Sequence, residues 1–384
     1  MNKIEEMIKR LCPNGVERVR LDSLLDYEQP TRYIVNSTEY DSKHSIPVLT
    51  AGQSFILGYT NEEDGIYKAS PQNPTIIFDD FTTGFHWVDF DFKVKSSAMK
   101  MLKLIESKKE NNFRYIYMAM KTIDYIPTNH TRHWISIYSK FEIPLPPLTI
   151  QREIVSVLDS FTTLIDKMKQ EVELRKKQME YYREKLLLFD EHEAGFVKIK
   201  DLFDTKNGYT PSTKNPDFWT DKGIPWVKME DIRENGTVLS DSAKHITMSA
   251  IKGSKLFNAN SIILATSATI GIHALVKVPH LSNQRFTNIY PKKEYENKID
   301  MKYAYYYFFK IDRWCKEHVT LGNFAGVNMS DFYDYDFPVP PLSTQRSIVS
   351  TLDAFEQYIS KLERLITLHE KQYAYYREKL LTFE

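Results

Sequence analysis

Acidic residues and a lysine in the first half of the chain have the types and spacing that could hold a metal ion for hydrolysis. Asp79 and Asp80 follow the strand-like segment TIIF, and Asp91 stands two positions before Lys93 in the segment DFK. Carboxylates bind divalent cations, and a bound cation activates water as a nucleophile. These residues allow the hypothesis of a metal-dependent nuclease that uses Asp80, Asp91 and Lys93.

The same segment also has a structural interpretation. HWVDFDFKVK alternates between apolar and polar residues, which predicts a strand that turns Asp89, Asp91, Lys93 and Lys95 towards solvent or DNA. In the second half of the chain, the segment that aligns with FDDFTTG is LATSATIG, which has no acidic residue in place of Asp79 or Asp80. We therefore prefer the strand and keep the nuclease as the alternative.

Polar residues in predicted loops could contact DNA. Sequence-specific binding needs side chains that reach base edges, supported by lysine, arginine and hydroxyl contacts to phosphate. In the first half the candidates are Thr50, Gln53, Tyr59, Thr82, Thr83, His86, Lys93 and Lys95. In the second half they are Lys206, Tyr209, Ser212, Thr213, Lys214, Lys228, Arg233, Ser267, Thr269, Gln284 and Arg285.

Gln284 and Arg285 are the preferred candidates for base contacts. Arginine forms two hydrogen bonds with guanine, and glutamine forms two with adenine. The alternative is that the segment NQRF only holds its own loop together through internal hydrogen bonds.

Composition sets wide limits on the class of protein. The chain has 384 residues, of which 42% are hydrophobic and 27% charged, and this predicts a soluble globular protein with two domains. The formal net charge is zero, so no overall basic field indicates nucleic acid. The two cysteines, Cys12 and Cys315, are too few for a CxxC zinc site or a disulfide framework. The start MNKIEEMIKRL is unlike a secretory signal, and a cytoplasmic location is expected.

One long segment of the chain is repeated. Residues 144–190 match residues 338–384 without a gap, and 25 of the 47 positions are identical. Upstream of each copy, TIIFDDFTTG resembles SIILATSATIG. A repeat of this length indicates a duplicated domain rather than a solenoid. The predicted domains are 1–143, 144–190, 191–337 and 338–384, of which the second and fourth are helical.

Both copies carry the heptad pattern that is typical of a coiled coil, with apolar residues at alternating steps of four and three. The seam of the first copy consists of Ile154, Leu158, Phe161, Ile165, Met168, Val172, Arg175 and Met179. The seam of the second copy consists of Ile348, Leu352, Phe355, Ile359, Leu362, Ile366, His369 and Tyr373. Arg175 and His369 occupy the same seam position. Such a polar residue fixes the register, or Arg175 extends from the edge of the seam.

The obvious partner of each helix is its own copy. Prolines at the start of each copy precede the helix, and Thr149 or Ser343 is predicted to cap its first turn. About 38 residues at a rise of 1.5 Å make a rod of nearly 60 Å. An antiparallel pair would have an approximate two-fold axis, and the commonest ligand with two separated half-sites is duplex DNA. A coiled-coil adaptor without a DNA role is the remaining alternative.

PLPPLTIQREIVSVLD, its copy and the closing YYREKLL resemble the conserved regions of the specificity subunits of type I restriction-modification systems. IPVLTAGQ from Ile46 and GYTPSTKNPDFWTDKGIPWVKMEDI from Gly208 are similar to two classes of target recognition domain. The resemblance covers the whole chain. It implies a mixed α/β fold in which two globular target recognition domains are separated by an antiparallel coiled coil of two long helices with pseudo-two-fold symmetry.

The resemblance also implies a non-catalytic subunit of a DNA methyltransferase and endonuclease complex. Each globular domain would read one half of a bipartite site in double-stranded DNA. Two methyltransferase subunits would bind the chain, and restriction subunits would join where present. S-adenosylmethionine, ATP and magnesium are expected on these partners, with no cofactor or metal on this chain. The segment nearest to an adenine-methyltransferase loop, NPDF, has Asp217 where that loop needs a second proline.

Overall fold

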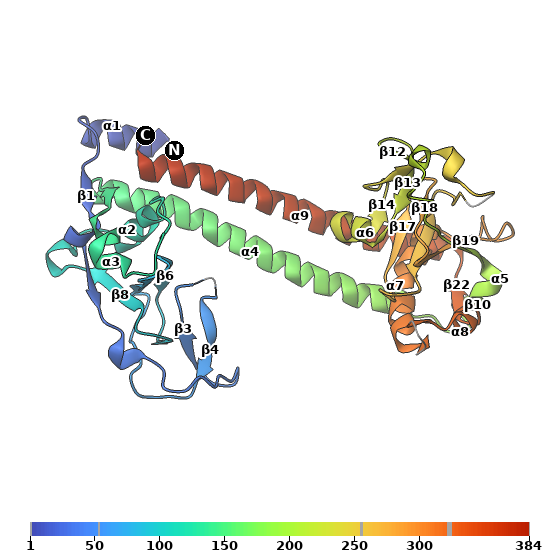
Figure 1. Ribbon diagram of the computed structural model, residues 1–384, viewed down its shortest axis with the longest axis horizontal. Coiled ribbons are helices and arrows are strands. Elements are labelled where there is room, and N and C mark those ends of the chain that lie inside the picture. The colour runs from blue at the N-terminus through green and yellow to red at the C-terminus, as the bar shows by residue number, and fades with distance from the viewer. Residues whose placement is uncertain (1, 53, 254–255, 321–324, 384) are drawn as a thin grey trace. The chain divides into compact units, whose positions relative to one another are not determined.

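The computed structural model describes residues 2–52, 54–253, 256–320 and 325–383 (Figure 1). The chain forms two compact units: unit 1 is Met1–Gln170 with Arg364–Glu384, and unit 2 is Glu171–Glu363. Each unit combines sheets and short helices with part of both long helices, α4 (Leu148–Leu186) and α9 (Leu342–Thr382). The prediction of a mixed α/β fold is therefore confirmed.

Unit 1 is built around a four-stranded antiparallel sheet. Its strand order is β2 (Leu25–Glu28), β8 (Met99–Leu104), β5 (Thr75–Asp79) and β6 (Phe85–Val88). Ile76 and Phe78 of β5 pack with the helices, whereas Ile77 packs with a second sheet on the other face. Burial on both faces explains the unbroken apolar run TIIF. The second sheet has the order β4 (Ile56–Thr60), β3 (Ile46–Leu49) and β7 (Lys93–Val94).

Unit 2 contains a corresponding pair of sheets. The main sheet has the order β11 (Phe203–Asn207), β19 (Phe286–Pro291), β16 (Ser261–Ala265), β17 (His273–Val276) and β14 (Val238–Leu239). The second sheet has the order β12 (Trp219–Thr220), β15 (His245–Ile246), β13 (Ile224–Val227) and β18 (Leu281–Ser282). Ile262 and Leu264 of β16 pack with α7 (Met301–Glu317), and Ile263 packs on the opposite face.

The two units share their strand pairing. The order β2-β8-β5-β6 matches β11-β19-β16-β17, and the parallel pair of β3 with β7 matches that of β13 with β18. The predicted relation between TIIFDDFTTG and SIILATSATIG is confirmed, because these segments form β5, β16 and the turns that follow them. Equivalent positions in the two units can therefore be compared directly.

The remaining elements complete each unit. In unit 1 they are α1 (Asn2–Leu11), β1 (Arg18–Arg20), α2 (Phe113–Met120), α3 (His133–Ser136) and β9 (Glu142–Pro144). In unit 2 they are β10 (Gly195–Lys198), α5 (Ile199–Leu202), α6 (Met229–Asn235), β20 (Val319–Thr320), β21 (Gly326–Val327), α8 (Met329–Tyr333) and β22 (Asp336–Val339). Across the described ranges, no helix is both long enough and apolar enough to cross a membrane.

Within unit 1 the two long helices pack in opposite directions. The ring of Phe161 on α4 lies 5.6 Å from the ring of Tyr376 on α9. Eight residues further along α4, Lys169 forms a 2.8 Å ion pair with Glu370, which lies earlier on α9. The residue numbers rise along one helix as they fall along the other, so the pairing is antiparallel.

Unit 2 has the same antiparallel pairing. Lys176 on α4 forms a 3.0 Å ion pair with Glu363 on α9. Further along α4, the ring of Tyr182 is stacked on that of Phe355 at 5.6 Å. All residues of the predicted seam in both helices are buried or half-buried.

The polar seam residue Arg175 extends from the seam edge, which is one of the two alternatives for it. Its Nε donates a 2.7 Å hydrogen bond to Glu171, and its Nη1 donates a 2.6 Å hydrogen bond to Gln178 on the same helix. The guanidinium also lies over the ring of Tyr358, 5.5 Å from its centre. The methylene stem covers the seam while the charge stays near solvent.

The prediction that Thr149 and Ser343 cap the long helices is wrong. The helices begin at Leu148 and Leu342, so both hydroxyl residues already lie within the first turn. An N-cap residue must precede the first helical residue. The prolines that end the extended segments before each helix occupy that place instead.

Unit 1 buries an ion pair beside the end of β5. The Nζ of Lys100 lies 3.1 Å from Oδ2 of Asp80, and both side chains are 1% exposed. The equivalent positions in unit 2 are Thr266 and Thr287, whose hydroxyls lie 3.1 Å apart. A buried charge that loses its partner is strongly destabilising, so the two residues of unit 1 depend on each other.

We expect the Asp80→Ala variant to lose about 3–5 kcal/mol of unfolding free energy, because Lys100 would then be a buried charge without its partner. Urea unfolding measures this loss. The double variant Asp80→Thr with Lys100→Thr copies unit 2 and is expected to recover most of it. A double variant as unstable as the single one would contradict the dependence of one residue on the other.

Candidate nucleic-acid interface

The main sheet of unit 2 brings several predicted DNA-contacting segments to one edge. Strands β11 and β16 end there and strands β19 and β17 begin there, because neighbouring strands are antiparallel. The loops that leave this edge are 208–215, 266–272 and 283–285. We call these loops the polar edge of unit 2. They contain Tyr209, Ser212, Thr213, Lys214, Ser267, Thr269, Gln284 and Arg285.

Hydrogen bonds fix the backbone of this edge and leave charged groups outside. Thr210 donates a 2.7 Å hydrogen bond to Oε1 of Gln284, and the N–H of Thr266 donates to the carbonyl of Arg285 at 3.1 Å. The N–H of Arg285 donates to Oδ1 of Asn283 at 3.0 Å. The exposed guanidinium of Arg285 makes no hydrogen bond or ion pair with the described part of the chain. The loop is thus internally held, and Arg285 remains available for a ligand.

Tyr209 stabilises this edge from inside. Its hydroxyl donates to the carbonyl of Ala250 at 2.9 Å, and its own carbonyl accepts from the indole N–H of Trp226 at 3.0 Å. A Cβ on the preceding Gly208 would lie 2.3 Å from the carbonyl oxygens of Ser282 and Asn283, so no side chain fits there. This close approach of two loops requires glycine.

Unit 1 has an equivalent polar edge, which consists of loops 80–84 and 95–98. Its turn after β5 is held by Oδ1 of Asp79, which accepts from the N–H groups of Phe81 and Thr82 at 2.8 Å each. Loop 95–98 contains Lys95 and corresponds to loop 283–285 of unit 2, since both follow the strand that is parallel to β3 or β13. This correspondence follows from the strand pairing and is not evident in the sequence.

A further loop of unit 1 lies against this edge. His86 Nε2 is 3.2 Å from the carbonyl of Gly52, and a Cβ on Gly84 would lie 2.3 Å from the carbonyl of Ala51. Thr50, on the same loop, is therefore near the turn of Thr82. Gln53 lies outside the described residues. Tyr59 is half-buried on β4, in register with Pro47.

The turns after β5 and β16 both contain a non-glycine residue in the left-handed backbone region. Thr83 has a φ of 56° and Ala268 a φ of 64°. The equivalent of Thr83 in unit 2 is Gly271, with a φ of 70°, because the N–H of each donates to the carbonyl of the last residue of the preceding strand. Such conformations cost free energy and persist where the surrounding structure imposes them. Both turns are thus held in fixed conformations. Thr83, a predicted DNA contact, is buried, and its hydroxyl donates to the carbonyl of Thr82 at 2.7 Å.

The sequence did not reveal a second segment at the edge of unit 1. The N–H of His133 donates to the carbonyl of Asp80, and the N–H of Trp134 donates to Oδ1 of Asp80, both at 2.8 Å. These bonds place the exposed Arg132 beside the turn. In unit 2 the N–H of Val327 donates in the same way to Thr266. The polar cluster HTRH was the available signal.

Lys93 does not face solvent as predicted. It is 2% exposed, and its Nζ lies 2.9 Å from Glu62 and donates to the carbonyl of Asp64 at 2.6 Å. Strand β7 has only two residues, so the alternation that was extended over ten positions ends too early to set the direction of Lys93. Lys95, two residues later, is half-buried in the polar edge.

The three residues of the nuclease hypothesis have separate partners. Asp80 pairs with Lys100, and Lys93 pairs with Glu62. Asp91 forms a 2.6 Å ion pair with Lys68. Among the residues that the structure describes, no three His, Cys, Asp or Glu side chains form a group that could hold a metal ion. The structure gives no support to the nuclease.

The remaining predicted residues of unit 2 lie around its edge. Lys228 directly follows β13, whose last carbonyl accepts from the N–H of Asn283 at 3.1 Å. Arg233 is exposed in the last turn of α6. Lys206 is half-buried on β11 with its Nζ 5.5 Å above the ring centre of Tyr290. Lys228 therefore adjoins the polar edge, whereas Lys206 lies on the sheet.

Comparison with known proteins identifies the family. A sequence model for the type I restriction modification DNA specificity domain matches residues 13–174 and, a second time, residues 191–370. The chain belongs to this family. It is a type I restriction-modification specificity subunit, and the resemblance seen in its repeated segments is confirmed.

Named relatives agree with this assignment. The specificity subunit of the Escherichia coli type I restriction enzyme EcoR124I/EcoR124II is 39% identical over 406 residues, which cover 100% of this chain and 98% of that protein. The specificity subunit of the Escherichia coli enzyme EcoprrI is 42% identical over 214 residues, which cover 53% of each protein.

A solved structure shares the fold of this specificity subunit. The type I restriction-modification S subunit from M. genitalium superposes with a TM-score of 0.59 at 15% identity, over 96% of this chain and 97% of that one. A likeness at this identity concerns the fold alone.

A buried histidine precedes β18 in unit 2 of this specificity subunit. This residue is His280, and its backbone forms two hydrogen bonds with Phe257. Its Nδ1–H donates to the carbonyl of Val278 at 3.0 Å, and the side chain is fully buried. Burial disfavours the charged ring and lowers the pKa of His280 to about 4.

We expect His280 to make the chain less stable as the pH falls from about 6.5 to about 4. The unfolded chain binds a proton near pH 6.5 and the folded chain only near pH 4, so acid favours unfolding by about 3 kcal/mol over this range. Urea unfolding at several pH values measures the slope. His280→Phe should remove the contribution of His280 to the dependence of unfolding free energy on pH. Replacement of the exposed His192 by Gln should leave that dependence unchanged. An unchanged slope in His280→Phe would contradict the assignment.

Proposed function

We propose that this specificity subunit reads a bipartite site in double-stranded DNA, one half-site with each unit. The observation that carries the proposal is the pair of equivalent polar edges, each built at the same side of the same four-strand order. Exposed Arg285 in one unit and exposed Arg132 in the other are suited to bases or phosphates. Different side chains on equivalent loops would give each unit its own target.

The antiparallel seam of α4 and α9 supports a role as spacer. In our proposal the helices form a coiled coil with an approximate two-fold axis, and its length sets the gap between the half-sites. A 39-residue helix is about 58 Å long at 1.5 Å per residue. Two DNA-reading units separated by a spacer would match two half-sites that lie at a distance from each other along one DNA duplex.

We further propose that the chain itself carries no catalytic site. Two methyltransferase subunits would bind it and supply the chemistry with S-adenosylmethionine, and restriction subunits that use ATP and magnesium would join where present. The separate partners of Asp80, Asp91 and Lys93 favour this over the nuclease. The complex would act in the cytoplasm.

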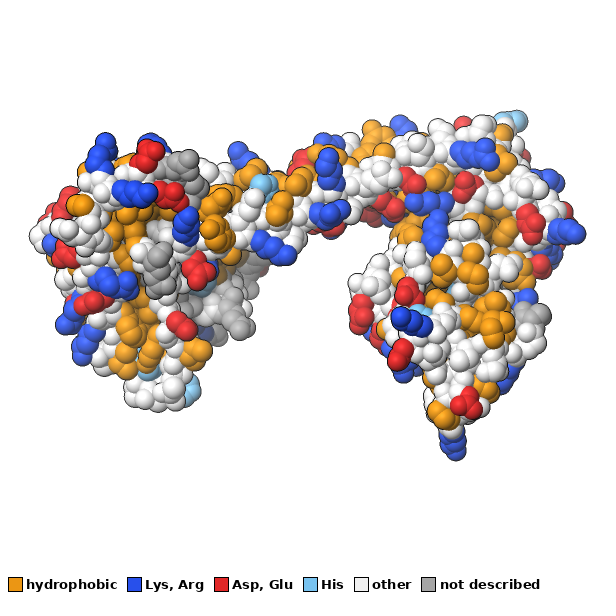
Figure 2. Space-filling model, turned by 90° about the horizontal axis from the view of Figure 1, so that it is seen from above, with side chains coloured by type: hydrophobic (Ala, Val, Ile, Leu, Met, Phe, Trp, Pro, Cys, Tyr) orange, Lys and Arg blue, Asp and Glu red, His pale blue; other side chains and the backbone are white. Residues whose placement is uncertain are grey.

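Exposed apolar residues on the long helices fit two copies of one partner. Figure 2 shows hydrophobic side chains that reach the surface of these helices between charged ones. Three such positions occur twice, 194 residues apart, and one member of each pair lies in each unit. They are Leu164, Leu368 and Tyr375 in unit 1, and Tyr358, Leu174 and Tyr181 in unit 2, with exposures between 43% and 61%. A repeated apolar surface that is this exposed favours a protein partner.

Exchange of residues 197–337 for the corresponding domain of another specificity subunit tests the DNA-reading role. We expect one half of the methylated site to change and the other to stay, because each unit reads by itself. Sequencing of methylated positions in genomic DNA, with and without the exchange, measures this. A change in both halves, or in neither, would contradict the proposal.

Substitution of exposed apolar residues on the long helices by alanine tests whether this surface binds the methyltransferase subunits. We expect Leu174→Ala with Tyr181→Ala to weaken the binding of one methyltransferase copy by about tenfold or more, because buried apolar anchors dominate interface energies. Native mass spectrometry of the complex counts the bound copies. Glu173→Ala with Glu180→Ala changes the exposed residues immediately before them and serves as the control. Equal loss in both variants would contradict a role for the apolar surface.

A further inference from the structure

A buried glutamine holds the start of α4 in unit 1. Gln151 is 1% exposed, and its Oε1 accepts from the N–H of Asn112 at 2.8 Å. Its Nε2 donates to the carbonyl of Pro146 at 2.8 Å and to Oδ1 of Asn111 at 3.0 Å. Asn112 is the N-cap of α2, the helix that packs on the main sheet. One side chain therefore ties the long helix to the unit that carries the polar edge.

Unit 2 repeats this arrangement at α9. Gln345 is fully buried, and its Oε1 accepts from the N–H of Asp300, the N-cap of α7, at 2.8 Å. Its Nε2 donates to the carbonyls of Pro340 and Lys298, at 2.8 Å each. All hydrogen-bonding groups of the amide are thus used, as burial of a polar side chain requires.

A tyrosine strengthens each connection. The hydroxyl of Tyr115 on α2 donates to the carbonyl of Pro144 at 2.8 Å. The hydroxyl of Tyr303 on α7 donates to the carbonyl of Pro338 at 3.1 Å. Both acceptors lie in the extended segment that leads into a long helix. These bonds fix the approach of the chain before the helix begins.

An ion pair adds a second point of attachment on each long helix. Arg114 on α2 lies 3.0 Å from Asp159 of α4, and Lys302 on α7 lies 2.7 Å from Asp353 of α9. The acidic residues stand eight positions after the glutamines, about 12 Å further along the helix at 1.5 Å per residue. Two attachment points at this separation resist tilting, whereas one alone would act as a pivot.

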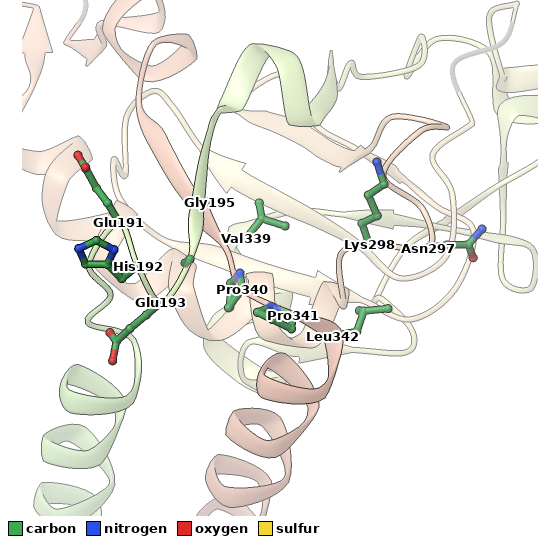
Figure 3. A pocket seen from close by; sticks show the side chains of 11 residues that line it. Glu191, His192, Glu193, Gly195, Asn297, Lys298, Val339, Pro340, Pro341 and Leu342 are labelled. Carbon is green, nitrogen blue, oxygen red and sulfur yellow. The ribbon is translucent and has the colours of Figure 1, made fainter.

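The extended segment before α9 has one side that faces an open pocket. This open surface pocket of about 560 Å³ is lined by residues that include His192, Gly195, Val339 and Pro341 (Figure 3). Figure 3 shows Pro340, Pro341 and Leu342 at the head of α9, with the side chains of Asn297 and Lys298 beside them. Lys298 and Pro340, whose carbonyls accept from Gln345, are among the residues that line this pocket.

The length of the helices makes the angle of attachment important. A tilt of about 10° at one end of a 39-residue helix moves its other end by about 10 Å. Successive base pairs are about 3.4 Å apart. The gap between two half-sites is therefore defined to one base pair only if the attachment limits the tilt of the helix to a few degrees.

We propose that these residues form two joints that fix the angle between each DNA-reading unit and its long helix, and thereby select the length of the gap between the half-sites. The first joint is Gln151, Tyr115 and the pair Arg114 with Asp159, and the second is Gln345, Tyr303 and the pair Lys302 with Asp353. The proposal rests on the proposed DNA-reading function. These are positioning residues, since they act through the helices and not on DNA.

The experiment uses the full chain with its methyltransferase partner and a set of DNA duplexes. The duplexes carry the half-sites found by methylation mapping, separated by gaps that differ by one base pair at a time. The variants are Tyr115→Phe and Gln151→Glu in the first joint, and Tyr303→Phe and Gln345→Glu in the second. We expect the preference for the best gap over its neighbours to fall about tenfold, the value of one lost hydrogen bond, with both half-sites unchanged.

Matched controls separate positioning from general loss of stability. Tyr138→Phe and Tyr305→Phe each remove a buried tyrosine hydroxyl from the same unit without touching a joint, since these hydroxyls bond to Met120 and Thr237. The controls should keep the gap preference of the unmodified chain even where thermal unfolding shows equal destabilisation. Folded joint variants that keep the full gap preference would overturn the proposal, and so would an equal loss in the controls. An unmodified chain without any bipartite preference would instead refute the proposed function.

Discussion

A helix of about forty residues with an apolar seam cannot leave that seam exposed in water, and its stability depends on what covers it. In this chain the cover for α4 is α9, and the cover for α9 is α4. The contact of Phe161 with Tyr376 in one unit and of Tyr182 with Phe355 in the other are two instances of the same requirement. A change in one helix therefore needs a matching change in the other, which keeps the two copies of the segment alike. The sheets face no such requirement, and their surface loops differ.

Periodicity explains what could be predicted. The long helices and their seam could be predicted because the heptad pattern is present within each copy of the repeated segment. The mixed α/β fold could be predicted from the family resemblance. The burial of Lys93 could not be predicted, because it depends on Glu62, which lies on a loop beyond β4. The same holds for Gln151: its partners Asn111 and Asn112 lie about forty residues earlier in the chain, and no local pattern connects them.

In the candidate nucleic-acid interface, too, local sequence predicts some features, whereas those that depend on distant residues cannot be predicted. The sequence predicts the loop positions of Thr82, Ser267, Gln284 and Arg285, because polar residues between strands usually lie in loops, and the structure confirms these positions. The sequence does not predict the place of Arg132, because it depends on contacts with Asp80, which lies far away in the sequence: the bonds from His133 and Trp134 and the 4.0 Å ion pair of Arg132 itself. The sequence also predicts Tyr209 as a DNA contact, whereas its hydroxyl donates to the carbonyl of Ala250. A loop sequence does not show which side of the loop a tyrosine faces.

The glutamine of each joint contacts mainly main-chain atoms: the N–H of a helix cap and the carbonyl of a proline, and in unit 2 also the carbonyl of Lys298. Main-chain atoms are the same whatever the side chains of the unit happen to be. A unit that offers a capped helix with a tyrosine and a basic residue at the places of Tyr115 and Arg114 can therefore be joined to this helix pair whatever its other side chains are. Genetic recombination at the repeated segments would then produce working combinations of units at once, instead of intermediates that must first be repaired by further mutation.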